Sequence, residues 1–426
     1  MPLALIKILV CFTLVLVLSR FRWPLSLALF SGAVLLGFWA GFTPASVAAA
    51  IGESAGQWQT LYLILIINLI LLISRLMEKA GQLKRIVGSF SGLIRDRRVV
   101  SALIPVLIGV LPMPGGALFS APLVGSATEE HRLSPEHNTI INYWFRHLWE
   151  YWWPLYPGFV LAVSLLNVSL WKVMLVQFPL AVFCLIAGGI FLLLPFPRLT
   201  PPAGGERGKH ARAFLKEALP IFLVVAVIFF ISVFFRILRG AGVEASLPSG
   251  VPLLLGLLVC LAWVIGFNHL SVREITAALR DRKFINFTIL IVAIMIFKGV
   301  LGRSGVVLAV KDELIAFRIP ALLIIVFLPF VSGLITGIAI GFVGLSFPVI
   351  LPLITGQPPL SYLAYAALAY SFGYMGMMLS PVHLCFLVSK DYFGAGFASS
   401  YRLLIKPVIL VMLLSIFYFI LMTHIN

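Results

Sequence analysis

Residues 137–158 read HNTIINYWFRHLWEYWWPLYPG, an apolar segment with ionisable side chains inside it. A charged side chain within a bilayer is costly, so it persists where it faces protein or a water-filled cavity and has a partner. Asn142, Arg146 and Glu150 follow one another at about one helical turn, which predicts a shared stripe and an ion pair between Arg146 and Glu150. His147 lies beside this stripe. The segment is therefore predicted to be the functional centre, and a structural Arg–Glu pair that fixes helix packing is the alternative.

The same segment contains two prolines that interrupt a membrane helix. Pro154 and Pro157 lack backbone donors and leave carbonyl groups free, which lipid cannot satisfy. The helix expected over 137–166 is therefore predicted to be broken inside the membrane.

Composition defines the class of the protein. Of the 426 residues, 61% are hydrophobic and 11% are charged, and the mean hydropathy is +1.10. Apolar runs of about 20 residues recur along the chain, which excludes a soluble globular domain. We therefore expect an all-α polytopic membrane protein whose surroundings are the lipid bilayer.

The net charge of +16 does not indicate nucleic-acid binding, because the Lys and Arg residues are concentrated between the apolar spans, as in cytoplasmic loops. The four cysteines stand singly in apolar spans, without CxxC or His/Cys spacing, and are predicted to be packing residues. No metal site and no cofactor are expected.

The first half of the chain is expected to cross the membrane near 3–20, 23–42, 58–77 and 170–195. An amphipathic segment at 81–94 is expected to lie in the membrane interface.

Residues 99–128 contain two apolar arms that are each too short to cross the hydrocarbon core. Between the arms stands Pro112-Met113-Pro114-Gly115-Gly116. Such arms predict a re-entrant hairpin whose tip is buried in protein.

A linker at 196–212, rich in Pro, Gly and charge, divides the chain into a first unit at 1–195 and a second at 213–426. The two units share landmarks at a nearly constant interval. These are GFTPASV at 41–47 with GFNHLSV at 266–272, Gly81 with Gly305, FSAPLV at 119–124 with LSFPVI at 345–350, and Pro157 with Pro381. The regular interval predicts two structural repeats.

The second unit is accordingly expected to repeat the first, with spans near 217–238, 248–267, 284–302 and 400–423, a hairpin at 319–354 and a broken helix at 360–389. Each unit would then cross the membrane five times, with the broken helix counted as one crossing. Its hairpin would enter and leave the membrane on the same side. Because five is odd, the repeats must be inverted. Placing both termini outside the cytoplasmic membrane puts most of the 31 Lys and Arg residues on the cytoplasmic side.

Inverted repeats with broken helices are typical of secondary transporters. The order of spans, hairpin, broken helix and span resembles the ion transporter superfamily, which includes dicarboxylate/sodium symporters, gluconate and citrate permeases and arsenite pumps. Within it, PMPGGALFSAPLVG and NYWFRHLWEYWWPLYPG are similar to a family of uncharacterised prokaryotic integral membrane proteins, domain of unknown function 401. The resemblance covers nearly the whole chain.

This resemblance implies an elevator-type carrier, commonly a homodimer, with its small-molecule substrate held between hairpin tips and helix breaks. The candidate substrate-binding residues come from both tips and both broken helices: Pro114, Gly115, Gly116, Asn142, Arg146, Pro154, Tyr156, Ser332, Gly333, Thr336, Gly337 and Ser380. Sodium-coupled dicarboxylate members carry a Ser-Asn-Thr signature at both tips. This chain has neither copy, which speaks against a sodium site and a dicarboxylate substrate.

The second broken helix carries no charge where the first has three ionisable residues: Arg146 corresponds to Tyr370, His147 to Ser371 and Glu150 to Tyr374. This asymmetry argues against a purely structural role. His383, beside the second break, is equally compatible with packing and with carrying a proton. His147, Glu150 and His383 are therefore predicted to couple transport to protons, with sodium coupling through backbone carbonyls as the alternative.

The predicted function is secondary active transport of a small anionic or polar metabolite, not an enzymatic reaction. An ion channel and an intramembrane enzyme are the alternatives. A channel would need a continuous polar lining, but the spans outside the two broken helices are almost wholly apolar. An enzyme would need a residue set such as HExxH or GxSxG, and the sequence contains neither.

Overall fold

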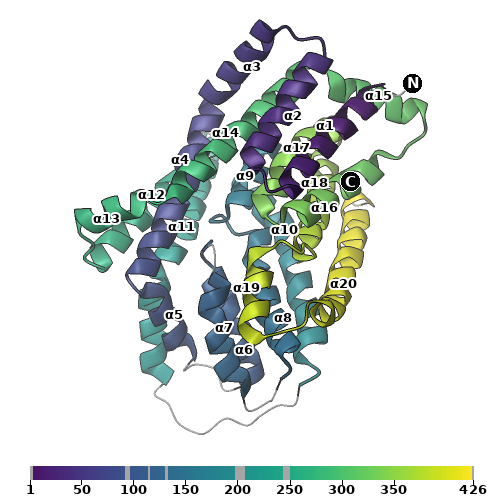
Figure 1. The fold of residues 1–426 in the computed structure, drawn as a ribbon. Helices are drawn as coiled ribbons and strands as arrows, with labels where there is room; N and C mark the ends of the chain where they lie inside the picture. The colour runs from purple at the N-terminus through teal and green to yellow at the C-terminus, as the bar shows by residue number, and fades with distance from the viewer. Residues whose placement is uncertain are drawn as a thin grey trace.

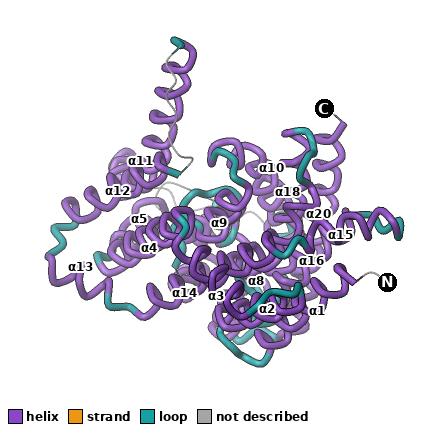
Figure 2. The backbone as a smooth tube through the Cα atoms, turned by 90° about the horizontal axis from the view of Figure 1, so that it is seen from above, coloured by secondary structure: helices purple, strands orange, loops and turns teal. Residues whose placement is uncertain are grey.

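The structure, a computed structural model, describes residues 3–91, 96–113, 116–129, 133–196, 207–242 and 250–424. Across these residues the chain is helical and contains no strand, which confirms the expected all-α class (Figure 2). Pro114 and Gly115, predicted at the first hairpin tip, lie outside the described residues, as does most of the predicted linker.

The first half contains ten α-helices in its described residues: α1 (Leu3–Arg20), α2 (Leu25–Trp39), α3 (Pro44–Gly56), α4 (Trp58–Lys79), α5 (Gln82–Ser91), α6 (Arg97–Gly109), α7 (Gly116–Thr128), α8 (Pro135–Arg146), α9 (Pro157–Leu166) and α10 (Leu170–Gly188). A 3₁₀ turn, η2 (Leu148–Tyr151), lies between α8 and α9, and a π-helical turn, η3 (Gly189–Leu193), extends α10.

The second half contains another ten in its described residues: α11 (Arg207–Gly240), α12 (Val251–Phe267), α13 (Val272–Leu279), α14 (Arg282–Arg303), α15 (Val306–Ala316), α16 (Ala321–Thr336), α17 (Ala339–Ile354), α18 (Pro359–Met378), α19 (Leu384–Phe393) and α20 (Phe397–His424). The order of long and short helices is therefore similar in the two halves (Figure 1).

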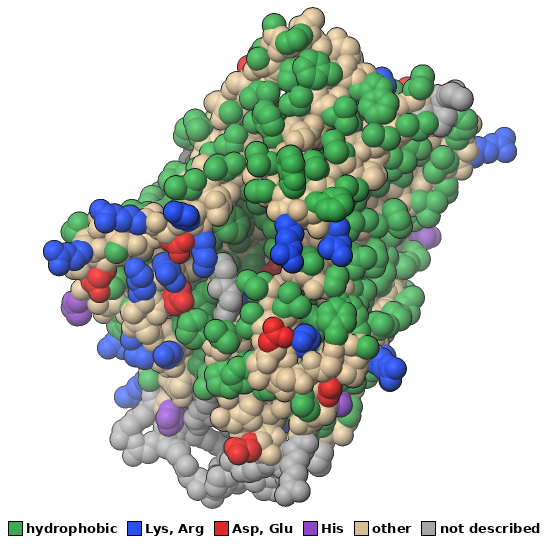
Figure 3. All heavy atoms as spheres, viewed as in Figure 1, with side chains coloured by type: hydrophobic (Ala, Val, Ile, Leu, Met, Phe, Trp, Pro, Cys, Tyr) green, Lys and Arg blue, Asp and Glu red, His purple; other side chains and the backbone are tan. Residues whose placement is uncertain are grey.

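Several helices are suited to a membrane. Six of the described helices are long and apolar enough to cross one: Leu3–Arg20, Trp58–Lys79, Leu170–Leu193, His210–Leu238, Arg282–Arg303 and Phe397–His424. Lys and Arg gather over the lobe that carries α13, whereas the upper part of the visible face is largely hydrophobic (Figure 3). These features suggest a multi-pass membrane protein, as the composition predicts.

Two expected spans are shorter than predicted. The span expected at 23–42 begins as α2 after Pro24 and ends at Trp39, so that its 15 residues reach roughly 22 Å. Gly41 lies just beyond its end with a φ of +88° and turns the chain. Its counterpart α12 has 17 residues in place of the expected 248–267.

Three short helices, α3, α13 and α15, were not expected, although the sequence contains their start signals. Thr43 caps α3 through a hydrogen bond from Ser46 N, and Pro44 follows it. Ser271 and Glu274 form a capping box at the start of α13. These N-capping residues lie inside segments that the hydropathy pattern predicts to be loops.

Helices of each half pack on helices of the other half. The hairpin arms α6 and α7 pack on each other and on α8, and α16 and α17 pack on each other and on α18. The half-helix α19 packs on α7 of the first hairpin, whereas α9 packs on α17 of the second. In Figure 1, α6 and α7 lie in the lower part of the molecule and α16 and α17 in the upper part. Each hairpin therefore contacts a broken helix of its own half and a half-helix of the other.

Glycines bring α16 and α18 into close contact. Ser332 and Gly333 lie inside α16 and not at the hairpin turn, where the sequence placed them. A Cβ added at Gly333 would collide with the carbonyl of Gly373, and one at Gly376 would collide with Phe330 O. The turn itself begins at Gly337, whose φ is +64°.

We predict that Gly333→Ala lowers the melting temperature of the purified protein in detergent, because the helix backbones would have to separate. An overpacked site typically costs about 1–3 kcal/mol. Gly302→Ala is the matched control, because it lies in a helix with no other group within 4 Å of its added Cβ. Equal melting temperatures for the two variants would contradict the close packing of α16 on α18.

Candidate functional site

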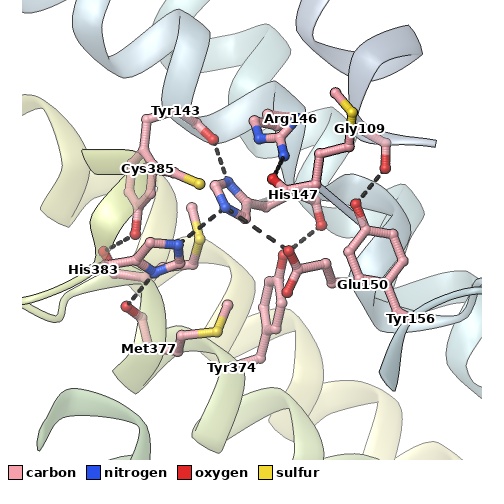
Figure 4. Close-up of polar contacts among 12 residues, drawn as sticks. Gly109, Tyr143, Arg146, His147, Glu150, Tyr156, Tyr374, Met377, His383 and Cys385 are labelled. Atoms are coloured by element: carbon pink, nitrogen blue, oxygen red, sulfur yellow. Dashed lines mark hydrogen bonds and ion pairs between the residues drawn. The ribbon is translucent and has the colours of Figure 1, made fainter. Parts of the chain in front are cut away.

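The two helix breaks face each other (Figure 4). The first lies between α8 and α9 and the second between α18 and α19. His147 caps the end of α8, His383 precedes α19, and their Nε2 atoms are 3.1 Å apart. Both imidazoles are buried, with 2% and 6% of their surface exposed. Two of the predicted coupling residues, one from each half, are therefore in direct contact.

Tyrosine hydroxyls bond backbone carbonyls at the two breaks. Tyr143 of α8 donates to Met378 O at the second break over 3.0 Å. Tyr370 of α18 donates in the opposite direction, to Glu150 O at the first break, over 2.7 Å. Tyr374, one turn later on α18, donates to the carbonyl of the histidine that caps α8. The breaks are thus held to each other by reciprocal hydrogen bonds.

Backbone carbonyls also orient both imidazoles. His147 Nδ1 lies 2.6 Å from Tyr143 O, and His383 Nδ1 lies 3.3 Å from Met377 O. A carbonyl oxygen only accepts, so this bonding assigns a proton to Nδ1 of both rings. When both rings are neutral, their Nε2 lone pairs therefore face each other.

Arg146 lies against the first hairpin and is 4% exposed. Its Nη2 donates to Met113 O over 2.7 Å, while Nε and Nη1 have no hydrogen-bond partner within the described chain. Gly116 lies so close to the guanidinium that an added Cβ would collide with it. The structure thus brings the predicted residues Arg146 and Gly116 together and leaves the buried guanidinium incompletely bonded.

The predicted ion pair between Arg146 and Glu150 is wrong. The α-helix ends at Arg146 and the chain continues as a 3₁₀ turn, so the two side chains do not share a helical stripe. Glu150 Oε1 instead lies 3.9 Å from His147 Nε2. The sequence-based prediction failed because it assumed an unbroken helix as far as Pro154.

Two other predicted residues attach the first hairpin to the breaks. Asn142 Nδ2 donates to Ala117 O over 3.0 Å and to Ser389 Oγ over 2.8 Å, which links α7, α8 and α19. Tyr156, at the start of α9, donates to Gly109 O at the end of α6. Both residues therefore have positioning contacts in this structure.

The turn of the second hairpin lies against the second break. A Cβ at Gly337 would be 2.9 Å from Ser380 Oγ and 3.2 Å from His383 N. Thr336, the last residue of α16, donates its hydroxyl to the helix backbone one turn earlier. Pro154 lies in the first break, between η2 and α9. Of the predicted residues of the second half, Gly337, Ser380 and His383 come together.

Cys385 is the site residue that sequence reasoning missed. It was assigned to packing, yet its Sγ and the ligand nitrogens of His147 and His383 all lie within 4.8 Å of one another. All three side chains are buried. The only local signal is the short spacing of His383 and Cys385, and the contact with His147 depends on the tertiary fold.

Over residues 4–422 the chain matches a family described as "Protein of unknown function (DUF401)". It belongs to the DUF401 family. None of the curated proteins compared with the chain matches it significantly. The match spans both halves and both breaks, so the site lies within the part of the chain that defines the DUF401 family.

For this DUF401 protein we predict that Tyr370→Phe lowers the melting temperature in detergent, because Glu150 O loses its donor. A buried acceptor left without a partner costs about 1–3 kcal/mol. Tyr365→Phe is the control on the same helix: the Tyr365 ring packs edge-on against Phe419 with centroids 4.8 Å apart, and its hydroxyl makes no hydrogen bond within the described chain. A Tyr370→Phe protein as stable as the control would show that the hydroxyl bond contributes nothing.

Proposed function

We propose that this DUF401 protein is a secondary active transporter that moves a small anionic or polar metabolite across the cytoplasmic membrane. The observation that carries the proposal is the buried guanidinium of Arg146. Two of its nitrogens lack a partner within the described chain, and it lies where a hairpin meets a broken helix.

An anion would complete the bonding of Arg146. A buried donor without an acceptor costs about 1–3 kcal/mol, and more when it is charged. Guanidinium binds carboxylate and phosphate oxygens through parallel N–H groups, which suits such an anion. Asn142 Oδ1, one turn earlier on α8, is also buried and without a partner in the described chain. It would accept a hydrogen bond from a hydroxyl or amide of the same substrate.

The exchange of packing partners between the halves supports inverted repeats. In the proposed elevator mechanism, the hairpins and broken helices, α6–α9 and α16–α19, move as one unit against the long helices of the scaffold. A cavity of about 410 Å³ lies between α9 and the scaffold helices α4, α12 and α14. Incomplete packing along this boundary favours relative movement there. Following the resemblance to the ion transporter superfamily, we further propose a homodimer with both termini outside the cytoplasmic membrane.

The proposed driving ion is a cation held between the two breaks. His147 and His383 direct their Nε2 atoms at each other, and Glu150 Oε1 lies 3.9 Å from His147 Nε2. Nitrogen lone pairs suit a proton better than sodium, which prefers oxygen ligands. Proton coupling is therefore the first choice and sodium coupling the second.

Inverted repeats predict that α5 and α15 lie on opposite sides of the membrane. Lys84 of α5 and Lys311 of α15 are both exposed, and all four native cysteines are buried. With a membrane-impermeant maleimide, we expect Lys311→Cys to react in intact cells and Lys84→Cys to react only after permeabilisation. Labelling of both positions from the same side would contradict the inverted topology.

Transport itself is tested by counterflow in proteoliposomes, with substrates chosen by a thermal-shift screen of small organic anions. We expect unlabelled substrate inside the vesicles to stimulate uptake of labelled substrate, which neither a channel nor an enzyme can do. Arg146→Met should abolish both the counterflow and the thermal stabilisation by substrate, because the anion loses its partner.

Arg236→Met is the matched control for this experiment, because Arg236 is exposed on α11 away from the breaks. It should retain both signals. Counterflow that survives Arg146→Met would overturn the anion site, and uptake by the wild type without stimulation from the far side would overturn the carrier mechanism.

A further inference from the structure

Three potential metal ligands from distant parts of the chain meet between the helix breaks. His147 follows α8, His383 precedes α19, and Cys385 lies in the first turn of α19. Their ligand atoms all lie within 4.8 Å of one another, and all three side chains are buried (Figure 4). Arg146 lies beside this cluster, with its guanidinium in electrostatic contact with Cys385, and it also donates a hydrogen bond to Met113 O of the first hairpin.

The orientation of the two imidazoles favours a positive species between them. The Nδ1 atoms of His147 and His383 face the carbonyl oxygens of Tyr143 and Met377 and are therefore protonated. This leaves two Nε2 lone pairs 3.1 Å apart in a buried site. Two neutral rings in this arrangement repel each other, whereas a shared cation between the nitrogens attracts both.

The distance between the two imidazole nitrogens suits a tetrahedral metal ion. Zinc binds imidazole nitrogen at about 2.0–2.1 Å and thiolate sulfur at about 2.3 Å, which places two ligand nitrogens about 3.4 Å apart. The observed 3.1 Å between the Nε2 atoms needs only a small adjustment. Glu150 Oε1, 3.9 Å from His147 Nε2, is close enough to become a fourth ligand.

The surroundings of the ligands also match those of a metal site. A metal-bound histidine usually donates its other ring N–H to a backbone carbonyl or a carboxylate, which fixes the ring and its tautomer. Both His147 and His383 have such a carbonyl. The thiol of Cys385 would release its proton on binding, and the resulting thiolate and the Glu150 carboxylate would balance the two charges of the ion.

The corresponding positions at the first break pack without an imidazole or a thiol. When α9 and α19 are aligned at their first residues, Pro157 and Leu384, His383 corresponds to Tyr156 and Cys385 to Gly158. Both counterparts are buried.

We propose that His147, His383 and Cys385 bind one divalent metal ion of the zinc class, with Glu150 as the fourth ligand. Two nitrogens, one sulfur and one carboxylate oxygen form a set that zinc and cobalt bind well and that calcium and magnesium do not. The inference does not depend on the proposed anion transport, but a bound metal ion would take the place of the coupling proton proposed above between the two Nε2 atoms.

The test is cobalt binding to the full-length protein purified in detergent. We expect one Co²⁺ per chain, with visible d–d bands of tetrahedral cobalt and a near-ultraviolet thiolate-to-cobalt charge-transfer band, both displaced by Zn²⁺. Cys385→Ser should lose the charge-transfer band, and His383→Gln should weaken binding by at least about tenfold. Cys260→Ser, another buried cysteine exchanged in the same way, should keep both bands.

Absence of stoichiometric cobalt, or a charge-transfer band that survives Cys385→Ser, would overturn the proposal. X-ray absorption of the zinc-loaded wild type provides a test that requires no variant to fold: one sulfur at about 2.3 Å is expected, and a first shell without sulfur would contradict the site. Neither measurement involves vesicles. A protein that binds zinc but fails in counterflow would refute the transport proposal alone, and a carrier without a metal site would refute this inference alone.

Discussion

A helix that breaks inside a membrane must find partners for the backbone groups that it frees. Lipid offers no donors, so each unpaired carbonyl would cost several kcal/mol. Here tyrosines of one broken helix serve the other: Tyr143 bonds Met378 O, and Tyr370 bonds Glu150 O. The hydrogen bonds run in both directions, so each break has a carbonyl that a tyrosine of the other half bonds. This mutual dependence holds the two halves together at the site.

The buried polar groups that lack a hydrogen-bond partner are informative about ligands. Tyrosine hydroxyls bond carbonyls at both breaks, yet Arg146 keeps Nε and Nη1 without a partner within the described chain, and Asn142 keeps Oδ1. A buried charged donor without an acceptor is costly, which favours a partner for the guanidinium from another molecule. The same reasoning applies to the facing lone pairs of His147 and His383, which attract a cation as the guanidinium attracts an anion.

The structural features that depend on local composition were predicted from the sequence. The features that depend on tertiary contacts were missed. Apolar runs located the long helices, and Pro157 marked where α9 begins. The capped helices α3 and α13 were missed because their signals, such as Thr43, lie within short polar segments. The ion pair of Arg146 with Glu150 was wrong because spacing gives neighbours only while a helix continues. Cys385 was assigned to packing because nothing local indicates that α19 brings it to the imidazoles.

The structure brings polar and ionisable side chains of both halves into one cluster. From the sequence, Arg146, His147 and Glu150 belong to the first broken helix, Tyr370 and Tyr374 are neutral counterparts in the second, and His383 is a candidate beside the second break. In the structure these tyrosines bond the carbonyls of the first break, and the second half adds His383 and Cys385 to the same cluster. Each half thus supplies what the other lacks. A site divided in this way exists only while the two breaks stay together, so the transport that we propose would have to move both breaks as one body.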